Sequence, residues 1–452
     1  MTQQTIAETA HLALRRVPVT VLALLLIAAI VSAVVLACRH EQKRRGEGAV
    51  SSPELTPVAF ADEAPHTGRF SAQIAYTLFG AESAGEITSN LLWDDAWFTS
   101  PATSYNHELA RAAMLLSTLA YSESGYYQAG SSQPAYMEDA LSALGFSQVS
   151  TESYRYRSEV VDEVLDAVTQ QADGVAYTIA SKRVAEPDGG TREVIAVAVR
   201  GSYGSEWLSN FNLGDAAGDL AAEGSDGHHS GYRAAAEEIK SELDTWRRAA
   251  HDRGNEVSML LCGHSRGGAV AGLLASMLDD EADSAAAPAA GDRVYAYTFA
   301  SPRTTVAASG DAARYSNIFN IVNPADPVPY LPLASWGFSR NGVTVSFPGV
   351  EDAASDGARA RMASAFTELT GEDEPYDPEA ERSIRGFVDD ASQRVPTAAD
   401  LTTPGGAVGV TTAAAAHLNP LTVLRGHYPS VYLAWLNATE AGDLKMSGAA
   451  GA

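Results

Sequence analysis

The sequence predicts an α/β protein with a mostly parallel central sheet covered by helices, preceded by an N-terminal transmembrane helix. Strand-like apolar runs alternate with helical patterns from residue 174 onward, as in parallel sheets with helical crossovers. The run EVSMLLCG at 256–263 leads through a glycine-rich turn into a helical pattern at 267–279. Residues 17–37 contain no charged residue, and roughly 20 apolar residues suffice for a helix to cross a bilayer.

The N-terminal region divides into a short segment, 1–16, a transmembrane helix, 17–37, and a flexible tether, 46–66, rich in Gly, Ser, Pro and Glu. A signal peptide usually has an apolar region of only about 7–15 residues, which favours an uncleaved anchor. Cleavage as a signal peptide, or as a lipoprotein at Cys38, is the alternative. Basic residues are more numerous after the span, which favours a main domain on the inside, but large domains translocate regardless of charge. We expect a single-pass protein of the cell membrane with its main domain on the extracytoplasmic side.

Residues 67–440 form the main domain in this prediction. We expect its N-terminal extension to be helical, because apolar residues have helical spacing in three stretches, 107–121, 136–147 and 157–171. Two strand-like runs follow at 174–184 and 192–201, and AEPDGGT between them is typical of a hairpin turn.

The rest of the domain alternates between helix and strand. After the hairpin we expect a helix at 231–252, the strand and helix around the glycine-rich turn, and two further strands at 293–302 and 316–324. An acidic, helix-like insertion follows at 350–395, and residues 441–452 are expected to be a disordered tail.

Composition excludes several kinds of function. The chain of 452 residues has a formal net charge of −25, whereas binding to nucleic-acid phosphates needs clustered Lys and Arg. Its two cysteines, Cys38 and Cys262, suggest no disulfide framework, and no Cys/His spacing resembles a zinc site. We therefore expect no nucleic-acid partner, no metal and no cofactor. The sequence gives no basis for inferring a protein partner.

The glycine-rich turn, GHSRGG at 263–268, contains a candidate nucleophile, Ser265. A nucleophile elbow needs a buried strand, a sharp turn with small neighbours and a following helix. Gly263 and Gly267 flank Ser265, and the helix N-terminus behind it favours developing negative charge. A glycine-rich turn that only packs tightly is the alternative.

A nucleophilic serine needs a base, and the base needs an orienting carboxylate. Asp326 follows a strand in a proline-stiffened loop, whereas its competitor Asp311 has no strand before it. Two histidines follow: His427 precedes an apolar terminal helix, and His417 lies at an expected helix end. We favour Asp326 and His427 because the fold can position both.

The negative charge that develops on the substrate oxygen needs two donors. One is the backbone N–H of the residue after the nucleophile, Arg266. The other must follow an earlier strand, where Ser202 offers both an N–H and a hydroxyl.

Five pieces in order resemble the class 3, or fungal-type, lipases of the α/β-hydrolase superfamily. They are VRGSYGSEWLSNFN, HSGY, GHSRGG, YAYTFASPR and NPADPVPYLP. The resemblance implies Ser265 as nucleophile, Asp326 as acid, His427 as base, and Ser202 with Arg266 as oxyanion hole. Two features depart from the family: Arg266 stands where the family usually has Leu, and 101 residues separate Asp326 from His427.

The family's lid would correspond to residues 203–213, in which Trp207, Leu208 and Phe211 have helical spacing. An amphipathic flap that exposes Trp207 to lipid and a short helix packed on the core remain equal alternatives.

The resemblance and the residues together predict a membrane-anchored serine hydrolase that cleaves carboxylic esters of lipids through an acyl-enzyme. Two alternatives remain: an acyltransferase or peptidase with the same triad, since fold and triad do not fix the acceptor, and an inert membrane-tethered lipid-binding domain.

Overall fold

The protein is described here from a computed structural model. It describes twelve stretches of the chain: 67–78, 85–129, 135–154, 175–186, 189–202, 230–281, 291–306, 312–352, 355–373, 377–401, 403–419 and 422–448. The expected membrane span at 17–37, the tether at 46–66 and the expected helix at 157–171 lie outside these stretches. Within them, no helix combines the length and the apolar character needed to cross a membrane.

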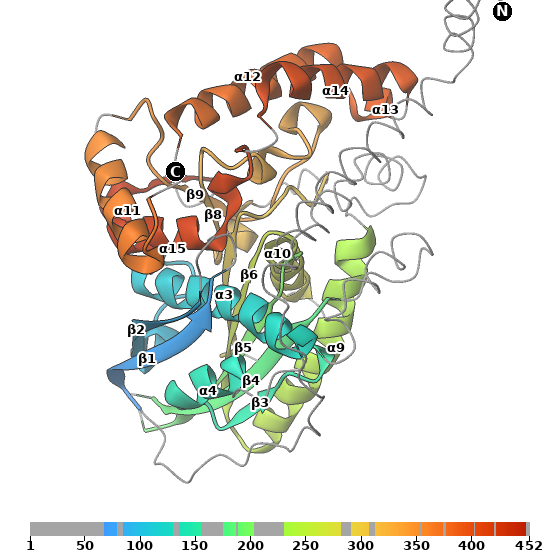
Figure 1. The fold of residues 1–452 in the computed structure, drawn as a ribbon. Helices are drawn as coiled ribbons and strands as arrows, with labels where there is room; N and C mark the ends of the chain where they lie inside the picture. The colour runs from blue at the N-terminus through green and yellow to red at the C-terminus, as the bar shows by residue number, and fades with distance from the viewer. Residues whose placement is uncertain are drawn as a thin grey trace, which may run out of the picture.

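An eight-stranded sheet forms the centre of the fold (Figure 1). Its spatial order is β10-β9-β8-β7-β6-β5-β4-β3, and the five strands from β5 to β9 are parallel. Antiparallel strands complete both edges. The strands are β3 (Gln148–Ser150), β4 (Tyr177–Ala185), β5 (Thr191–Val199), β6 (Glu256–His264), β7 (Arg293–Phe299), β8 (Ile318–Val322), β9 (Val343–Ser346) and β10 (Lys445–Ser447). The α/β class, the mostly parallel sheet and the β4–β5 hairpin are as predicted.

Helices cover both faces of the sheet, which explains why the central strands are almost continuously apolar. Successive side chains of β6 point to opposite faces: Met259 and Leu261 pack with α9 (Ser230–Asp252) and α10 (Arg266–Asp280), whereas Leu260 and Cys262 pack with α3 (His107–Ala129). The sheet is therefore the middle of three layers, and the loops after its parallel strands meet at one edge.

Helix α3 is almost wholly buried, although its sequence contains several hydroxyl side chains. Ser117 and Thr118 donate hydrogen bonds to the carbonyl oxygens of Ala113 and Met114, four residues earlier. This pairing satisfies hydroxyls that would otherwise be costly to bury. The next helix, α4 (Tyr136–Ala143), packs against α3.

The segment between the acid loop and the last helix folds into four helices: α11 (Ser355–Thr370), α12 (Pro378–Arg394), α13 (Ala398–Leu401) and α14 (Pro404–His417). Helix α11 packs against the terminal helix α15 (Pro429–Ala438), and α12 packs against α14. Figure 1 shows α12, α13 and α14 together at one end of the molecule, away from β1 and β2. The helical insertion predicted from the sequence is therefore present, and its helices precede α15 and the edge strand β10.

Two expectations are wrong. The N-terminal extension is not only helical, because β1 (Arg69–Thr77) and β2 (Glu86–Asp94) form an antiparallel hairpin. In β1 the burial alternates from residue to residue, the two-residue period of a half-buried strand. Residues 441–448, part of the expected disordered tail, contain a short 3-10 helix and strand β10, which pairs with β9.

Candidate active site

Ser265 occupies a sharp turn between β6 and α10. Its backbone has φ 58° and ψ −127°, a conformation that costs a non-glycine residue energy and is concentrated at functional sites. The Ser265 N–H donates to the carbonyl oxygen of Phe299 at the end of β7, 2.8 Å away. A β-carbon on Gly263 would lie 2.3 Å from the Gly267 carbonyl oxygen, and one on Gly267 would lie 2.2 Å from that of Val199. Both flanking glycines are therefore required, as the sequence predicts, because any side chain would collide with neighbouring backbone atoms.

The Ser265 side chain lies in a hydrogen-bonded chain with His427 and Asp326. The distance from His427 Nε2 to Ser265 Oγ is 2.9 Å, and His427 Nδ1 lies 2.9 Å from Asp326 Oδ2. All three residues are buried. A carboxylate only accepts hydrogen bonds, so Nδ1–H donates to Asp326 and, in the neutral ring, Nε2 accepts from the Ser265 hydroxyl. This arrangement suits transfer of the serine proton to the imidazole.

The fold brings these residues together despite their separation of 101 positions between Asp326 and His427. Asp326 lies in the loop after β8, and His427 ends a short 3-10 helix, η6 (Arg425–His427), just before α15. The Asn323 side-chain amide donates to the Gly426 carbonyl oxygen at 2.8 Å. This bond joins the acid loop to the histidine segment directly.

Asp326 has two further partners. Tyr432 on α15 donates its hydroxyl to Asp326 Oδ2 at 2.8 Å, and the Val328 N–H donates to Oδ1 at 2.9 Å. Burial, and next the charge of Asp326, raise the pKa of Tyr432 well above its ordinary value, so this phenol remains a donor. Tyr432 was not predicted from the sequence, although it lies only five residues after His427 on the expected terminal helix.

His264 supports the site from the other side. Its Nε2 lies 2.8 Å from the His427 carbonyl oxygen, which must accept, so Nδ1 accepts from the Tyr121 hydroxyl at 3.0 Å. Burial, together with the neighbouring His427, holds the pKa of His264 well below its ordinary value. The ring is therefore neutral. The position of His264 beside Ser265 was the only sequence signal for this role, and Tyr121 had none.

The two candidate oxyanion donors are buried and lie on segments that converge at the turn. Arg266 is the first residue of α10, and Ser202 follows the end of β5. Gly201 packs so closely beneath the turn that a β-carbon there would lie 2.5 Å from the His264 carbonyl oxygen. The structure thus places the loop after β5 next to the nucleophile turn.

The other candidates are not part of this arrangement or lie outside the described residues. His417 ends α14, and its Nε2 is 3.6 Å from Asp390 Oδ2 on α12. Asp311 and the lid candidates Trp207, Leu208 and Phe211 lie outside the described stretches.

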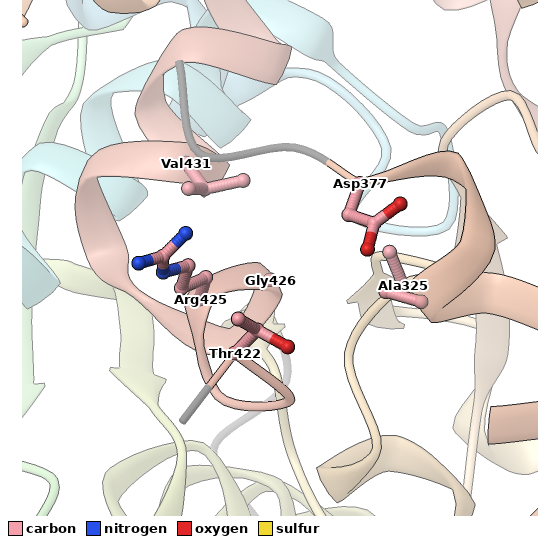
Figure 2. A pocket seen from close by; sticks show the side chains of 7 residues that line it. Ala325, Asp377, Thr422, Arg425, Gly426 and Val431 are labelled. Carbon is pink, nitrogen blue, oxygen red and sulfur yellow. The ribbon is translucent and has the colours of Figure 1, made fainter. Parts of the chain in front are cut away.

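A small pocket lies behind the acid loop and the histidine segment (Figure 2). Figure 2 shows Asp377 and Ala325 on one side and Val431, Arg425 and Thr422 on the other. Ala325 precedes Asp326, and Arg425 comes two residues before His427, so the pocket adjoins the backbone that holds the Asp326–His427 pair.

Comparison with known proteins gives related results. Residues 196–336 match the family model described as Lipase (class 3). The chain is 31% identical over 150 residues to "Secreted mono- and diacylglycerol lipase 1" of Fusarium solani, covering 32% of this chain and 42% of that protein. The alignment thus spans about two fifths of the relative's length.

Two solved structures are similar at low identity. The lipase–propeptide complex of Rhizomucor miehei is 20% identical over 53% of this chain and 67% of its own, with a TM-score of 0.34. The lipase from Rhizopus microsporus var. chinensis is 16% identical over 56% of this chain and 75% of its own, with a TM-score of 0.32. The resemblance to class 3 lipases predicted from the sequence is confirmed for residues 196–336.

Proposed function

We propose that this chain, whose central part resembles class 3 lipases, is a serine hydrolase that cleaves carboxylic esters. The observation that carries the proposal is the continuous chain of hydrogen bonds from Ser265 Oγ through His427 to Asp326, with both distances at 2.9 Å. A serine at a strained strand-to-helix turn, within reach of a neutral imidazole, is the arrangement that nucleophilic acyl transfer needs.

In the proposed reaction, Ser265 Oγ attacks the ester carbonyl carbon while His427 Nε2 takes the hydroxyl proton. Asp326 keeps the imidazole in the reactive tautomer and stabilises the imidazolium that forms. The tetrahedral oxyanion accepts hydrogen bonds from the Arg266 N–H and from Ser202. His427 then gives its proton to the leaving alcohol, and water hydrolyses the acyl-enzyme by the same steps in reverse.

The proposed substrates are acyl esters of lipids. The Fusarium relative is named for mono- and diacylglycerols, and the expected apolar span at 17–37 would hold the enzyme at a bilayer. We place the chain in the cell membrane as a single-pass protein with an extracytoplasmic catalytic domain. The lid role of Trp207, Leu208 and Phe211 stays a prediction.

The first experiment combines active-site labelling with hydrolysis. Wild-type protein should react with a fluorophosphonate probe and hydrolyse p-nitrophenyl esters of graded chain length. Ser265→Ala should fold normally, remain unlabelled and lose hydrolysis by several orders of magnitude. An unlabelled wild-type protein would instead indicate an inert binding domain, and a labelled Ser265→Ala variant would move the nucleophile elsewhere.

A second measurement distinguishes the acceptors. With water alone, a hydrolase releases free carboxylic acid. If added alcohol or amine captured most of the acyl group at millimolar concentration, the chain would be an acyltransferase.

A further inference from the structure

Two arginine side chains bind the loop that carries Asp326. Four consecutive carbonyl oxygens, those of residues 329–332, accept hydrogen bonds from Arg303 or Arg340. Arg340 Nη1 donates to the Pro329 oxygen at 2.6 Å. Arg303 Nη1 donates to the oxygens of Tyr330 and Pro332, and the Arg303 N–H donates to that of Leu331 at 2.8 Å. The acid loop is thus held along its length by donors from outside the loop.

Arg340 also connects the acid loop to the nucleophile turn. The same Nη1 donates to the Ser301 carbonyl oxygen at 2.9 Å. Ser301 packs against the start of α10, because a β-carbon on Gly268 would lie 3.3 Å from Ser301 Cβ. One guanidinium therefore bridges the segment that contacts the start of α10 and the loop that supplies the acid.

The backbone around Arg340 is itself fixed on both sides. Ser339 forms an antiparallel bridge with Thr305, and its N–H donates to the Thr305 oxygen at 2.7 Å. The Asn341 oxygen accepts from the Asn320 side chain on β8 at 2.9 Å. The backbone that carries Arg340 is therefore fixed by Thr305 on one side and by β8 on the other.

The loop that Arg340 binds carries a buried carboxylate, Asp326. Among the residues that the structure describes, the ionisable groups around the acid loop and the histidine segment include His264, Arg266, Arg303, Tyr330, Arg340, Asp377, Arg425 and Tyr432. Burial lowers the pKa of His264 and raises the pKa values of Tyr330 and Tyr432, so these three are uncharged near neutral pH.

The negative charge of Asp326 favours the charged form of Arg340. Burial, and next the neighbouring Arg303, lower the pKa of Arg340 to about 10, which still leaves it charged at neutral pH. Placing a second cation so close to Arg303 carries an energetic cost. The four carbonyl dipoles and the Asp326 carboxylate offset it.

We propose that Arg340 is a positioning residue of the Ser265–His427–Asp326 site, which fixes the acid loop against the nucleophile segment and offsets the buried charge of Asp326. This inference rests on the proposed function. It predicts two separable contributions, a geometric one from the two hydrogen bonds of Nη1 and an electrostatic one from the charge of the guanidinium.

The experiment compares Arg340→Met with Arg340→Lys, using a soluble short-chain ester and the full pH profile of kcat/KM. Arg340→Met removes the cation, so the Asp326–His427 pair takes up a proton more readily. The acid limb of the profile should then move to higher pH by about half a unit. We expect kcat to fall about tenfold with little change in KM, because the Arg340 guanidinium binds backbone carbonyl oxygens of the protein.

Arg340→Lys keeps the charge, but its shorter side chain does not bring a donor to the position from which Nη1 bonds both the Ser301 and the Pro329 oxygens. Its acid limb should stay at the wild-type pH while kcat is lowered. Arg382→Met is the matched control, because it removes an arginine that pairs with Glu379 on the exposed surface of α12. It should leave both kcat and the acid limb unchanged.

The outcomes separate this inference from the proposed function. An active wild-type enzyme whose acid limb does not move in Arg340→Met would overturn the electrostatic role, and an unchanged kcat in both Arg340 variants would overturn the positioning role. If Arg340→Met does not fold, the lysine variant decides: a displaced acid limb despite the retained charge overturns the proposal. A wild-type chain that hydrolyses no ester overturns the proposed function, and the role of Arg340 with it.

Discussion

Ser265, His427 and Asp326 each depend on neighbours that lie far away in the sequence. His264 hydrogen-bonds the carbonyl oxygen of His427, which lies 163 residues later in the sequence. Tyr432 donates a hydrogen bond to Asp326, which lies 106 residues earlier. Both supporting groups are uncharged because burial moves their pKa values away from neutrality. Neutral supports leave Asp326 as the group that stabilises positive charge on His427 when the imidazole takes a proton.

The choice between the two histidines can be tested by substitution. His427→Ala should lower kcat/KM for ester hydrolysis by about a thousandfold or more, as loss of a triad base does. His417→Ala is the matched control and should retain wild-type activity, because its nearest carboxylate is Asp390 on α12. Activity of both variants on the same ester decides, and the reverse result would assign the base to His417.

Glu123 on α3 is a buried acidic residue outside the candidate active site. It is fully buried, and its Oε2 accepts from the Met137 N–H at 2.8 Å. Glu138, which accepts from the Thr151 hydroxyl, lies close enough to add a second negative charge. Burial, and next Glu138, raise the pKa of Glu123 from 4.5 to about 9, so Glu123 keeps its proton in the folded protein at neutral pH.

This raised pKa makes stability depend on pH. Between pH 4.5 and about 9, the unfolded chain releases the Glu123 proton while the folded protein keeps it. The contribution of this group is therefore fully present below pH 4.5 and is lost progressively until the pH passes about 9. In Glu123→Gln the side chain cannot ionise, so the melting temperature should fall less between pH 5.5 and pH 8.5 than in the wild type.

Glu368→Gln is the control for this measurement, because Glu368 is exposed on α11. Its melting temperature should follow the wild-type dependence on pH. If Glu123→Gln and wild-type protein lost stability in parallel across this range, Glu123 would be ionised in the fold.

At the scale of elements, the sequence predicted those whose signal is local. The β6–turn–α10 unit was predicted because a buried apolar run, two required glycines and a helical pattern are all adjacent in the chain. The β1–β2 hairpin was missed although β1 alternates in burial, because two alanines, Ala72 and Ala75, weaken the alternation of large apolar and polar residues in its sequence. Strand β10 was missed because its three residues are exposed and acquire their conformation only from the edge of β9.

The pairing of β10 with β9 predicts a role for the C-terminal residues. Lys445 and Ser447 lie opposite Ser346 and Thr344, and Lys445 also pairs with Asp352. Truncation after Glu440 should lower stability by about 1–2 kcal/mol through the lost backbone hydrogen bonds. Esterase activity at room temperature should persist, because the triad lies elsewhere. Thermal unfolding is the measurement.

Truncation after Gly448 keeps β10 and is the control for this prediction. It should leave the melting temperature at the wild-type value. An equal melting temperature for the two truncated proteins would show that the pairing of β10 does not contribute to stability.

For the whole molecule, the three candidate catalytic residues could be predicted from the sequence, but the residues that support them could not. Ser265, Asp326 and His427 were chosen because each follows or precedes a recognisable element. Tyr432 and Arg340 were not, because nothing local distinguishes them from other buried or loop residues, and the position of His264 beside Ser265 does not by itself indicate its contacts. Their contacts depend on how the sheet and α15 pack, which a single sequence does not specify.

The distribution of charge along the chain affects how the protein would interact with a membrane surface. Residues 1–66 contain six basic and six acidic residues, so the entire net charge of −25 belongs to residues 67–452. A domain of that charge is repelled by an anionic membrane surface. The 21 residues at 17–37, if helical, would span about 32 Å, close to the thickness of a hydrocarbon core. The proposed span and the charge would thus act in opposite directions on membrane binding.

Deleting residues 1–66 should therefore separate membrane attachment from catalysis. The full chain should sediment with membranes and resist extraction by high salt, because an apolar span is held by burial of its side chains rather than by charge. The deleted protein should remain in the supernatant, and it should not bind vesicles that contain anionic lipid. Its kcat/KM on a soluble short-chain ester should equal that of the full chain, since every proposed catalytic residue lies beyond residue 200.

If the deleted protein still sediments with membranes, a second surface binds lipid, and the anchor is not the sole attachment. If the full chain is instead released by salt, residues 17–37 do not span the bilayer.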